Sequence, residues 1–219
     1  LVSISNALNT TQGLLMRANN MANETDLQYG RKLKYTPKDF RMVVDRAAAK
    51  LYLIDGDGVF KLYSVTFGDS VGQDACGSYR IGNKEKDPIW RSPDGTAIQA
   101  KAAGNPLGTR WMPLTPDTTG LPRDFGIHAA VPADLMKSNG GPGFIRMSQA
   151  DAEELFDLVA RTTPTEIEES CKPESLYPAS APRVEGDAPA EGVEEEEAPP
   201  EPELEMSGTD VDSDATDEE

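Results

Sequence analysis

Short runs rich in apolar, β-branched and aromatic residues occur along the central part of the chain. Three such runs cover residues 42–44, 51–54 and 59–65, and an Asp-Gly-Asp-Gly turn at 55–58 separates the last two. Short apolar runs of this composition, bounded by turn residues, are typical of strands, and an Asp-Gly pair between two runs favours a hairpin. The pattern therefore predicts an antiparallel meander.

A helical period follows further along the chain. Ser148 is a good N-cap residue, and with Asp151 three positions later it predicts the start of a helix. The apolar residues after it recur at i, i+3, i+4 and i+7, as one buried helical face requires: Ala152, Leu155, Phe156 and Val159. We expect residues 165–168 to supply a closing strand.

The first part of the chain has a third pattern. Apolar positions predict a short helix near residues 2–8, and Thr10 or Thr11 can cap a second helix that includes residues 14–18. Lysines then alternate with Leu33 and Tyr35 at 32–35, and this alternation predicts a strand. The first 36 residues are therefore expected to form a small helical unit closed by a strand.

Negative charge is concentrated at the C-terminal end. From Glu169 onward there are 18 acidic and 2 basic residues, so this segment carries −16 of the net charge of −17. It cannot bury enough apolar surface to offset the entropy lost on ordering, and we expect it to be disordered. It can act as a solubilising tail or as a docking tail for a basic protein partner. The remainder is nearly neutral, so composition gives no support for nucleic-acid binding by a basic face, and none is expected.

The candidate chemistry lies between residues 125 and 147. His128 is the only histidine, a glycine-rich turn at 138–143 brings backbone N–H groups together, and Arg146 precedes the predicted helix. These are the parts of a site for an anionic or oxyanionic group. A purely structural histidine, packed between strands and hydrogen-bonded to a backbone carbonyl, would give the same sequence pattern.

Two cysteines, Cys76 and Cys171, are the other reactive groups. No metal-ligand spacing surrounds them, so neither a metal site nor a cofactor is expected. They can form a disulfide in an oxidising envelope or remain two free thiols. We interpret Cys76 as a small buried residue rather than a nucleophile.

The order of the residues around His128 resembles that of the L,D-transpeptidase catalytic domain, also called YkuD, in which a His-Gly pair precedes a Ser-x-Gly-Cys-Ile/Val-Arg-Met/Leu run. The resemblance places His128 at the family's general base and Arg146 at its arginine. Gly143 falls at the glycine before the nucleophile, where backbone N–H groups stabilise an oxyanion. Phe144 falls at the nucleophilic cysteine, and Ala129 replaces the glycine that follows the histidine.

Residues 1–36 are similar to a LysM repeat, a strand–helix–helix–strand unit that binds glycans containing N-acetylglucosamine. The family's opening Gly-Asp-Thr-Leu is missing apart from Leu1, so its first strand is expected upstream. Asn19 is the family's usual loop asparagine, which can be structural or bind sugar. In the resemblance to the L,D-transpeptidase domain, Trp111 follows an Asn-Pro-Leu-Gly run typical of that family and is either a core residue or the aromatic wall of a peptide groove.

Together these resemblances imply a fold that is mainly β with a few helices. We expect an L,D-transpeptidase-like β-sandwich or mixed-sheet domain at 38–168, a small α/β LysM-like unit at 1–36 and a disordered acidic tail at 169–219. They also imply a cell-envelope protein, periplasmic or otherwise outside the cytoplasm, whose partner is peptidoglycan, through both its glycan and its stem peptides.

Three functions remain open at this point. A phenyl ring can neither ionise nor attack a carbonyl, so the first is an inactive L,D-transpeptidase, a pseudoenzyme that binds the cell wall without cutting it. The second is an active transpeptidase or carboxypeptidase in peptidoglycan cross-linking, with a relocated nucleophile such as Ser138 or Cys171. The third is a structural envelope protein that acts through its acidic tail.

Overall fold

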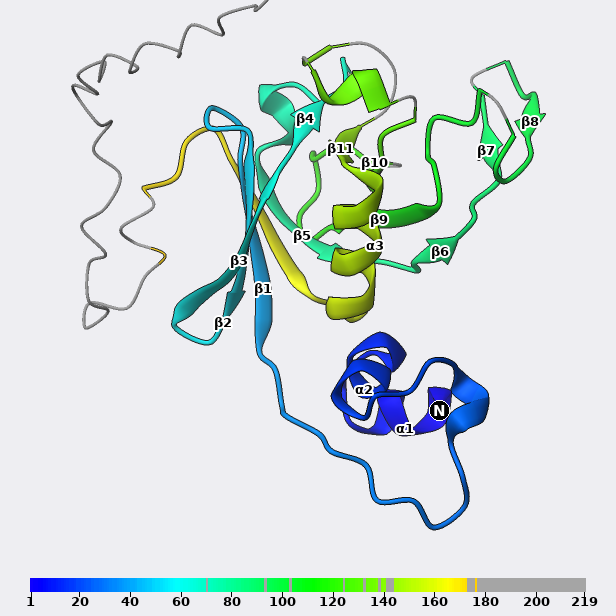
Figure 1. The fold of residues 1–219 in the computed structure, drawn as a ribbon. Helices are drawn as coiled ribbons and strands as arrows, with labels where there is room; N and C mark the ends of the chain where they lie inside the picture. Colours follow the sequence, from blue (N-terminus) through cyan, green and yellow to red (C-terminus); the bar gives the residue numbers. More distant parts are fainter. Residues whose placement is uncertain are drawn as a thin grey trace, which may run out of the picture. The chain divides into compact units, whose positions relative to one another are not determined.

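The computed structural model describes residues 1–69, 71–92, 94–102, 104–123, 125–131, 133–137, 139–140 and 144–172 together with Leu176. Within these residues the chain forms a mixed ten-stranded sheet, a separate two-stranded sheet and three α-helices (Figure 1). The fold is therefore mainly β with a few helices, as predicted. Most of the acidic tail lies outside the described residues, and so does the disorder predicted for it.

The strands and helices follow in chain order. The main sheet contains β1 Phe40–Asp45, β2 Lys50–Asp55, β3 Gly58–Ser64, β4 Thr66–Phe67, β5 Gly77–Ile81, β6 Glu85–Lys86, β9 Arg110–Pro116, β10 Phe125–Ala129, β11 Ile145–Met147 and β12 Pro164–Glu168. A separate hairpin consists of β7 Trp90–Arg91 and β8 Ala97–Ile98. The helices are α1 Val2–Ala7, α2 Gln12–Ala18 and α3 Gln149–Leu158, with short 3-10 turns at Glu24–Asp26, Gln73–Ala75 and Ala133–Met136.

The strand order of the main sheet is β3-β2-β1-β12-β5-β9-β10-β11-β4, and β6 pairs with β9. Two pairs are parallel, β1 with β12 and β10 with β11, whereas the others are antiparallel. The predicted meander is confirmed as β1 to β3. The predicted closing strand is confirmed as β12, which fills the centre of the sheet between β1 and β5.

Helix α3 covers the part of the sheet that carries the candidate site. The hydroxyl of Ser148 accepts a hydrogen bond from the Asp151 N–H at 3.1 Å, which confirms the predicted cap. The predicted apolar face is buried, with contacts to β9 and β10. Its residues join the main core with apolar side chains of the sheet, so α3 and strand β10 are fixed against one another.

The first 36 residues contain both predicted helices but not the predicted strand. Thr11 caps α2 by accepting from the Leu14 N–H at 3.0 Å. No strand forms at 32–35, because no neighbouring strand pairs with these residues in the described structure. Instead the side-chain amide of Asn19 bonds both backbone groups of Lys34, accepting from its N–H at 2.7 Å and donating to its carbonyl at 2.9 Å.

The chain stays packed against the sheet beyond Glu168, so the predicted tail boundary at Glu169 is too early. Cys171 and Leu176 are buried against a second apolar cluster formed by Val43, Tyr52 and Ile54. The Cys171 thiol donates to the Asp45 carboxylate at 3.1 Å. Burial, reinforced by that carboxylate, raises the pKa of the thiol to about 12.

Both cysteines are free, so the disulfide alternative is not formed. Cys76 is only partly buried, not fully buried as interpreted from the sequence. In the part of the chain that the structure describes, no helix is long and apolar enough to cross a membrane.

Candidate functional site

Strand pairing brings three of the candidate residues into one row. In the antiparallel pair of β9 and β10, Trp111 lies opposite His128, and in the parallel pair of β10 and β11, His128 lies beside Arg146. Residues that are 17 and 18 positions apart in sequence therefore become cross-strand neighbours. Phe144 directly precedes β11 and completes the group.

His128 is fully buried and hydrogen-bonded through both ring nitrogens. Nε2 accepts from the backbone N–H of Phe144 at 3.1 Å, and Nδ1 lies 2.8 Å from the carbonyl oxygen of Ala129. A neutral imidazole has one N–H donor and one acceptor, so the proton is on Nδ1. Burial lowers the pKa of His128 to about 4, and the positive charge of Arg146 acts in the same direction. The ring is therefore neutral at pH 7.

An aromatic cluster surrounds the imidazole. The ring of Phe144 is half-buried, with its centroid 5.4 Å from that of Trp111 and 6.4 Å from that of Phe125. It meets the imidazole edge to face, with the two ring centroids 6.2 Å apart. Arrangements of this kind add to the stability gained by burial alone. The surroundings of the candidate base are therefore apolar.

Arg146 is fully buried and holds neighbouring backbone in place. Its Nη1 donates to the carbonyl of Gly140 at 2.9 Å, Nη2 to the carbonyl of Phe67 at 2.8 Å, and Nε to the hydroxyl of Thr66 at 3.1 Å. Burial lowers the pKa of the guanidinium, while the negative charge of Asp69 opposes that shift. Arg146 thus ties strand β4 and the turn at Gly140 to strand β11.

The described residues offer the imidazole no partner with a nucleophilic atom. Within the described part of the chain, neither a thiol nor a hydroxyl is hydrogen-bonded to His128. The Cys171 thiol is bonded to Asp45 in the second cluster. Two candidates, Gly143 and Ser138, lie outside the described residues. Among the residues that are described, no three His, Cys, Asp or Glu side chains gather as a metal site would require.

Several residues that shape this group were not identified from the sequence. Thr66 and Phe67 accept from Arg146, and the backbone of Pro106 acts to raise the pKa of His128, against the effect of burial. The Asn-Pro-Leu-Gly run marked the approach to β9 but gave no sign that Pro106 would reach the imidazole. Asn19 belongs to the N-terminal helical unit and is buried there, with its amide bonded to backbone groups.

Comparison with known families decides the assignment. The family model described as the L,D-transpeptidase catalytic domain, YkuD, matches residues 39–167, which is more than half of the chain. The chain belongs to the L,D-transpeptidase catalytic domain family. The LysM domain model matches residues 1–36 of this L,D-transpeptidase-like protein. Both resemblances inferred from the sequence are therefore confirmed.

Solved L,D-transpeptidases are among the structures similar to this one. The Ldtfm–avibactam carbamoyl enzyme is 25% identical over 66% of this chain and 55% of its own, with a TM-score of 0.44. An L,D-transpeptidase from Mycobacterium smegmatis is 16% identical over 64% of each chain, with a TM-score of 0.44. A mutant L,D-transpeptidase from Enterococcus faecium is 24% identical over 64% of this chain and 54% of its own, also at 0.44. This chain thus spans little more than half the length of some of these proteins. No curated protein matches it.

Proposed function

We propose that this chain is a cell-wall-associated protein that binds peptidoglycan without carrying out transpeptidation. In the family's reaction the histidine deprotonates a cysteine, and the thiolate attacks the carbonyl before the terminal D-amino acid of a stem peptide. The glycan is the ligand class suggested by the LysM match, and the stem peptide is the one suggested by the transpeptidase match. In this chain Phe144 stands where the resemblance aligns the cysteine.

One hydrogen bond carries the proposal, the donation from the Phe144 N–H to Nε2 of His128. A general base needs a free lone pair directed at the proton that it removes, and this lone pair is occupied. The same backbone N–H is directed at the imidazole instead of at a developing oxyanion. The side chain of Phe144 adds no atom that could attack. The candidate base and one candidate oxyanion donor are therefore hydrogen-bonded to each other.

Release of D-alanine from tetrapeptide stems, followed by mass spectrometry, tests the inactivity. We expect no release from the wild-type chain and the same baseline from His128→Ala. An active L,D-transpeptidase assayed in parallel shows that the substrate is competent. Turnover by the wild-type chain that disappears in His128→Ala would contradict the proposal. A carbapenem adduct on Ser138 or on a cysteine would instead support an active enzyme with a relocated nucleophile.

Co-sedimentation with insoluble peptidoglycan tests the binding half of the proposal. We expect the wild-type chain to pellet with the cell-wall material. His128→Ala should pellet to the same extent, because it leaves the LysM-like unit unchanged. A chain that stays in the supernatant would contradict binding without affecting the conclusion about catalysis.

A basic protein partner for the acidic tail remains a separate hypothesis, tested by a pull-down that compares the full chain with a truncated one. The truncation has to keep residues through Leu176, because Leu176 is buried against the sheet. A shorter chain would expose the second apolar cluster and attract partners for an unrelated reason. Partners lost on removal of residues 177–219 would support the hypothesis.

A further inference from the structure

Helix α2 of the LysM unit approaches helix α3 of the transpeptidase domain so closely that Gly13 has no room for a side chain. A Cβ atom there would lie 2.6 Å from Cβ and 3.0 Å from Cα of Asp157. The backbone of Gly13 is helical, so glycine is not required for its conformation. Glycine is a poor residue for a helix interior. The contact with α3 is therefore what explains a glycine at this position.

Thr11 joins the two helices from the same end of α2. Its hydroxyl caps α2 and also donates a hydrogen bond to the carbonyl of Asp157. The carbonyls in the last turn of a helix have no partner within that helix. Lys84 donates to two others nearby, those of Phe156 and Val159. The C-terminal end of α3 is thus completed by one residue of each domain.

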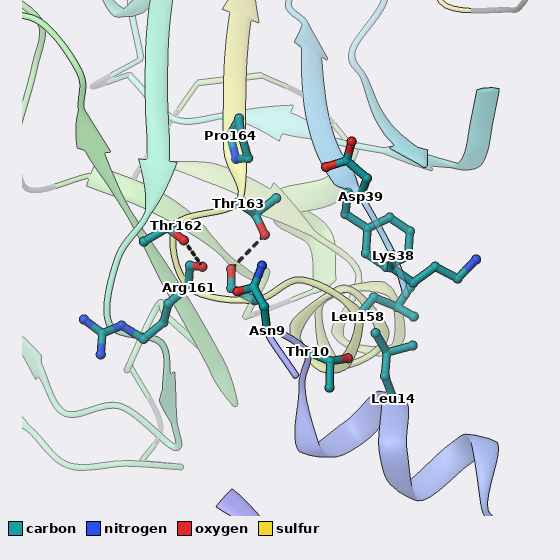
Figure 2. A pocket seen from close by; sticks show the side chains of 12 residues that line it. Asn9, Thr10, Leu14, Lys38, Asp39, Leu158, Arg161, Thr162, Thr163 and Pro164 are labelled. Carbon is teal, nitrogen blue, oxygen red and sulfur yellow. Dashed lines mark hydrogen bonds between the residues drawn. The ribbon is translucent and has the colours of Figure 1, made fainter. Parts of the chain in front are cut away.

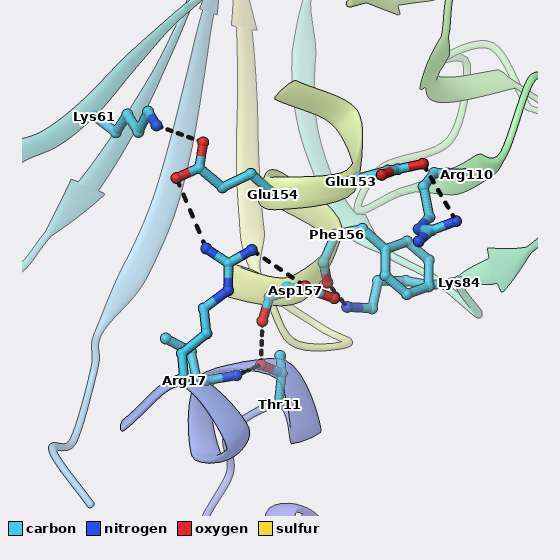
Figure 3. Close-up of polar contacts among 10 residues, drawn as sticks. Thr11, Arg17, Lys61, Lys84, Arg110, Glu153, Glu154, Phe156 and Asp157 are labelled. Carbon is cyan, nitrogen blue, oxygen red and sulfur yellow. Dashed lines mark hydrogen bonds and ion pairs between the residues drawn. The ribbon is translucent and has the colours of Figure 1, made fainter. Parts of the chain in front are cut away.

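Opposite charges follow the same line of contact, as Figure 3 shows. Arg17 of α2 pairs with Asp157 at 3.2 Å and with Glu154 at 3.9 Å. Glu154 also pairs with Lys61 of strand β3. The Arg17 side chain is 50% exposed, so these pairs contribute orientation more than stability. Leu14, between Gly13 and Arg17 on α2, packs against the main core.

A small cavity beside this contact is too small to offer another explanation for it. It measures about 90 Å³ and is lined by residues from both domains, among them Thr10, Leu14, Leu158 and Arg161 (Figure 2). Sites for small organic ligands measure roughly 300–1,000 Å³. The cavity can hold water, so direct contact of the two helices, rather than a shared ligand, joins the domains.

We propose that the α2–α3 contact is a specific interdomain latch that holds the LysM unit in one orientation on the transpeptidase domain. The alternative is two independent domains on a flexible connection, since residues 31–39 contain neither helix nor strand. A flexible connection would give no reason for the glycine at 13 or for a Thr11 bond to the end of α3. Helix α3 packs on strand β10, which carries His128. If the LysM unit binds glycan as proposed above, the latch fixes that glycan relative to the candidate site.

Distances between two spin labels, measured by double electron–electron resonance, test the latch. The measurement needs neither ligand nor turnover, so its outcome is independent of the proposed function. Labels are placed at Asn6→Cys in α1 and at Asp57→Cys in the exposed turn between β2 and β3. The background carries Cys76→Ser, whereas Cys171 can stay because its thiol is buried and its pKa is raised to about 12. We expect a single narrow distance distribution. A broad distribution in this protein would overturn the proposal.

Gly13→Ala then separates the two explanations, because only the latch predicts a change in the width of the distance distribution. Without an interface, alanine favours helix α2 and leaves the distance distribution unchanged. With the latch, the added methyl group collides with Asp157, and the distribution widens about twofold or more. Adding Asp157→Gly to Gly13→Ala restores space and should narrow it again. An unchanged width in Gly13→Ala would overturn the latch.

A charge reversal keeps the test decisive if Gly13→Ala fails to fold. Arg17→Glu places a negative charge beside Glu154 and Asp157 on an exposed side chain that is not part of the core. We expect the same widening. Lys32→Glu is the matched control, because it makes the same change of charge at an exposed position of the same unit. Equal widths for the two reversals would count against the latch.

Discussion

The candidate site and the LysM unit are held in place in different ways. In the site, His128 and Arg146 are both fully buried, and most of the hydrogen bonds described for them join side chain to backbone. In the LysM unit most side chains are exposed, and few residues are buried: Ser5, Thr11, Leu15, Asn19 and Met21. The candidate site is therefore held by buried hydrogen bonds, whereas the LysM unit has few buried side chains, among them Asn19, and also contacts α3.

This difference indicates how a site can keep its geometry without its reaction. Removing a buried donor leaves the backbone carbonyls that it bonds without a partner, which is costly whatever the chemistry of the site. Arg146 therefore has a structural reason to be present, and His128 has one as well, because each of its nitrogens is bonded to backbone. The presence of both residues is consequently weak support for catalysis, and the identity of residue 144 is the more informative observation.

The largest expected effect follows from Arg146→Met. Methionine keeps most of the apolar volume but removes the donors to Gly140, Phe67 and Thr66. Each buried acceptor left without a donor costs about 1–3 kcal/mol, so the loss of all three bonds should cost more than about 3 kcal/mol. Urea unfolding measures the loss. Arg80→Met is the matched control, because Arg80 forms an exposed pair with Asp117 that is worth about 1 kcal/mol or less. Equal losses in the two variants would mean that the buried hydrogen bonds of Arg146 stabilise the fold no more than an exposed ion pair does.

The next largest expected effect is a dependence of folding stability on pH. This dependence should originate in the candidate site. The pKa of His128 is lowered from 6.5 to about 4. Between these values the unfolded chain binds more protons than the folded one, so stability rises with pH. Neutral His128 therefore contributes roughly 3 kcal/mol to the free energy of unfolding. This contribution is complete above about pH 6.5 and is lost as the pH falls to about 4.

Unfolding by urea between pH 4 and 7 measures this contribution. Carboxylates titrate in the same range, so the comparison is with His128→Gln, which has no ionisable group at this position. The wild-type curve should fall more steeply than that of the variant as the pH is lowered. Parallel curves would mean that the imidazole is already charged or solvated in the folded protein, and the site would then resemble the exposed LysM unit.

The same contrast separates what could be predicted from the sequence from what could not. The apolar runs and the Asp-Gly turn within 42–65 predicted β1 to β3, and the helical period after Ser148 predicted α3 with its cap, because each of these signals lies within one continuous segment. The row of Trp111, His128 and Arg146 depends on the register between strands separated by loops. For strands joined by long loops, the register depends on which faces of both strands are buried together, so no single segment of the sequence contains it.

The errors also have physical causes. The strand predicted at 32–35 has the right alternation, but a strand needs a neighbour for its backbone groups, and Asn19 bonds those of Lys34 instead. The tail boundary at Glu169 was read from composition. Composition did not show that Cys171 and Leu176 would each find a place against the outer cluster. Isolated apolar residues in a polar segment were the only available signal.

The smallest of these effects is expected from Asn19→Ala, and it tests the LysM side of the comparison. The Asn19 amide donates to the carbonyls of Leu15 and Lys34 and accepts from the Lys34 N–H. Its removal should cost about 1–2 kcal/mol, because buried backbone groups lose their partners. Amide hydrogen exchange should show the loss locally, as faster exchange at Lys34 with little change in strand β10.

Asn6→Ala is the control for this substitution, because Asn6 is exposed in α1 and alanine is the better helix former. It should change stability by less than about 0.5 kcal/mol. If Asn19→Ala matched this control in stability but weakened co-sedimentation with peptidoglycan, the amide would act on sugar and not on the fold. If instead exchange accelerated equally at Lys34 and in β10, the two regions would unfold as one unit, and the contrast between them would apply to burial but not to cooperativity.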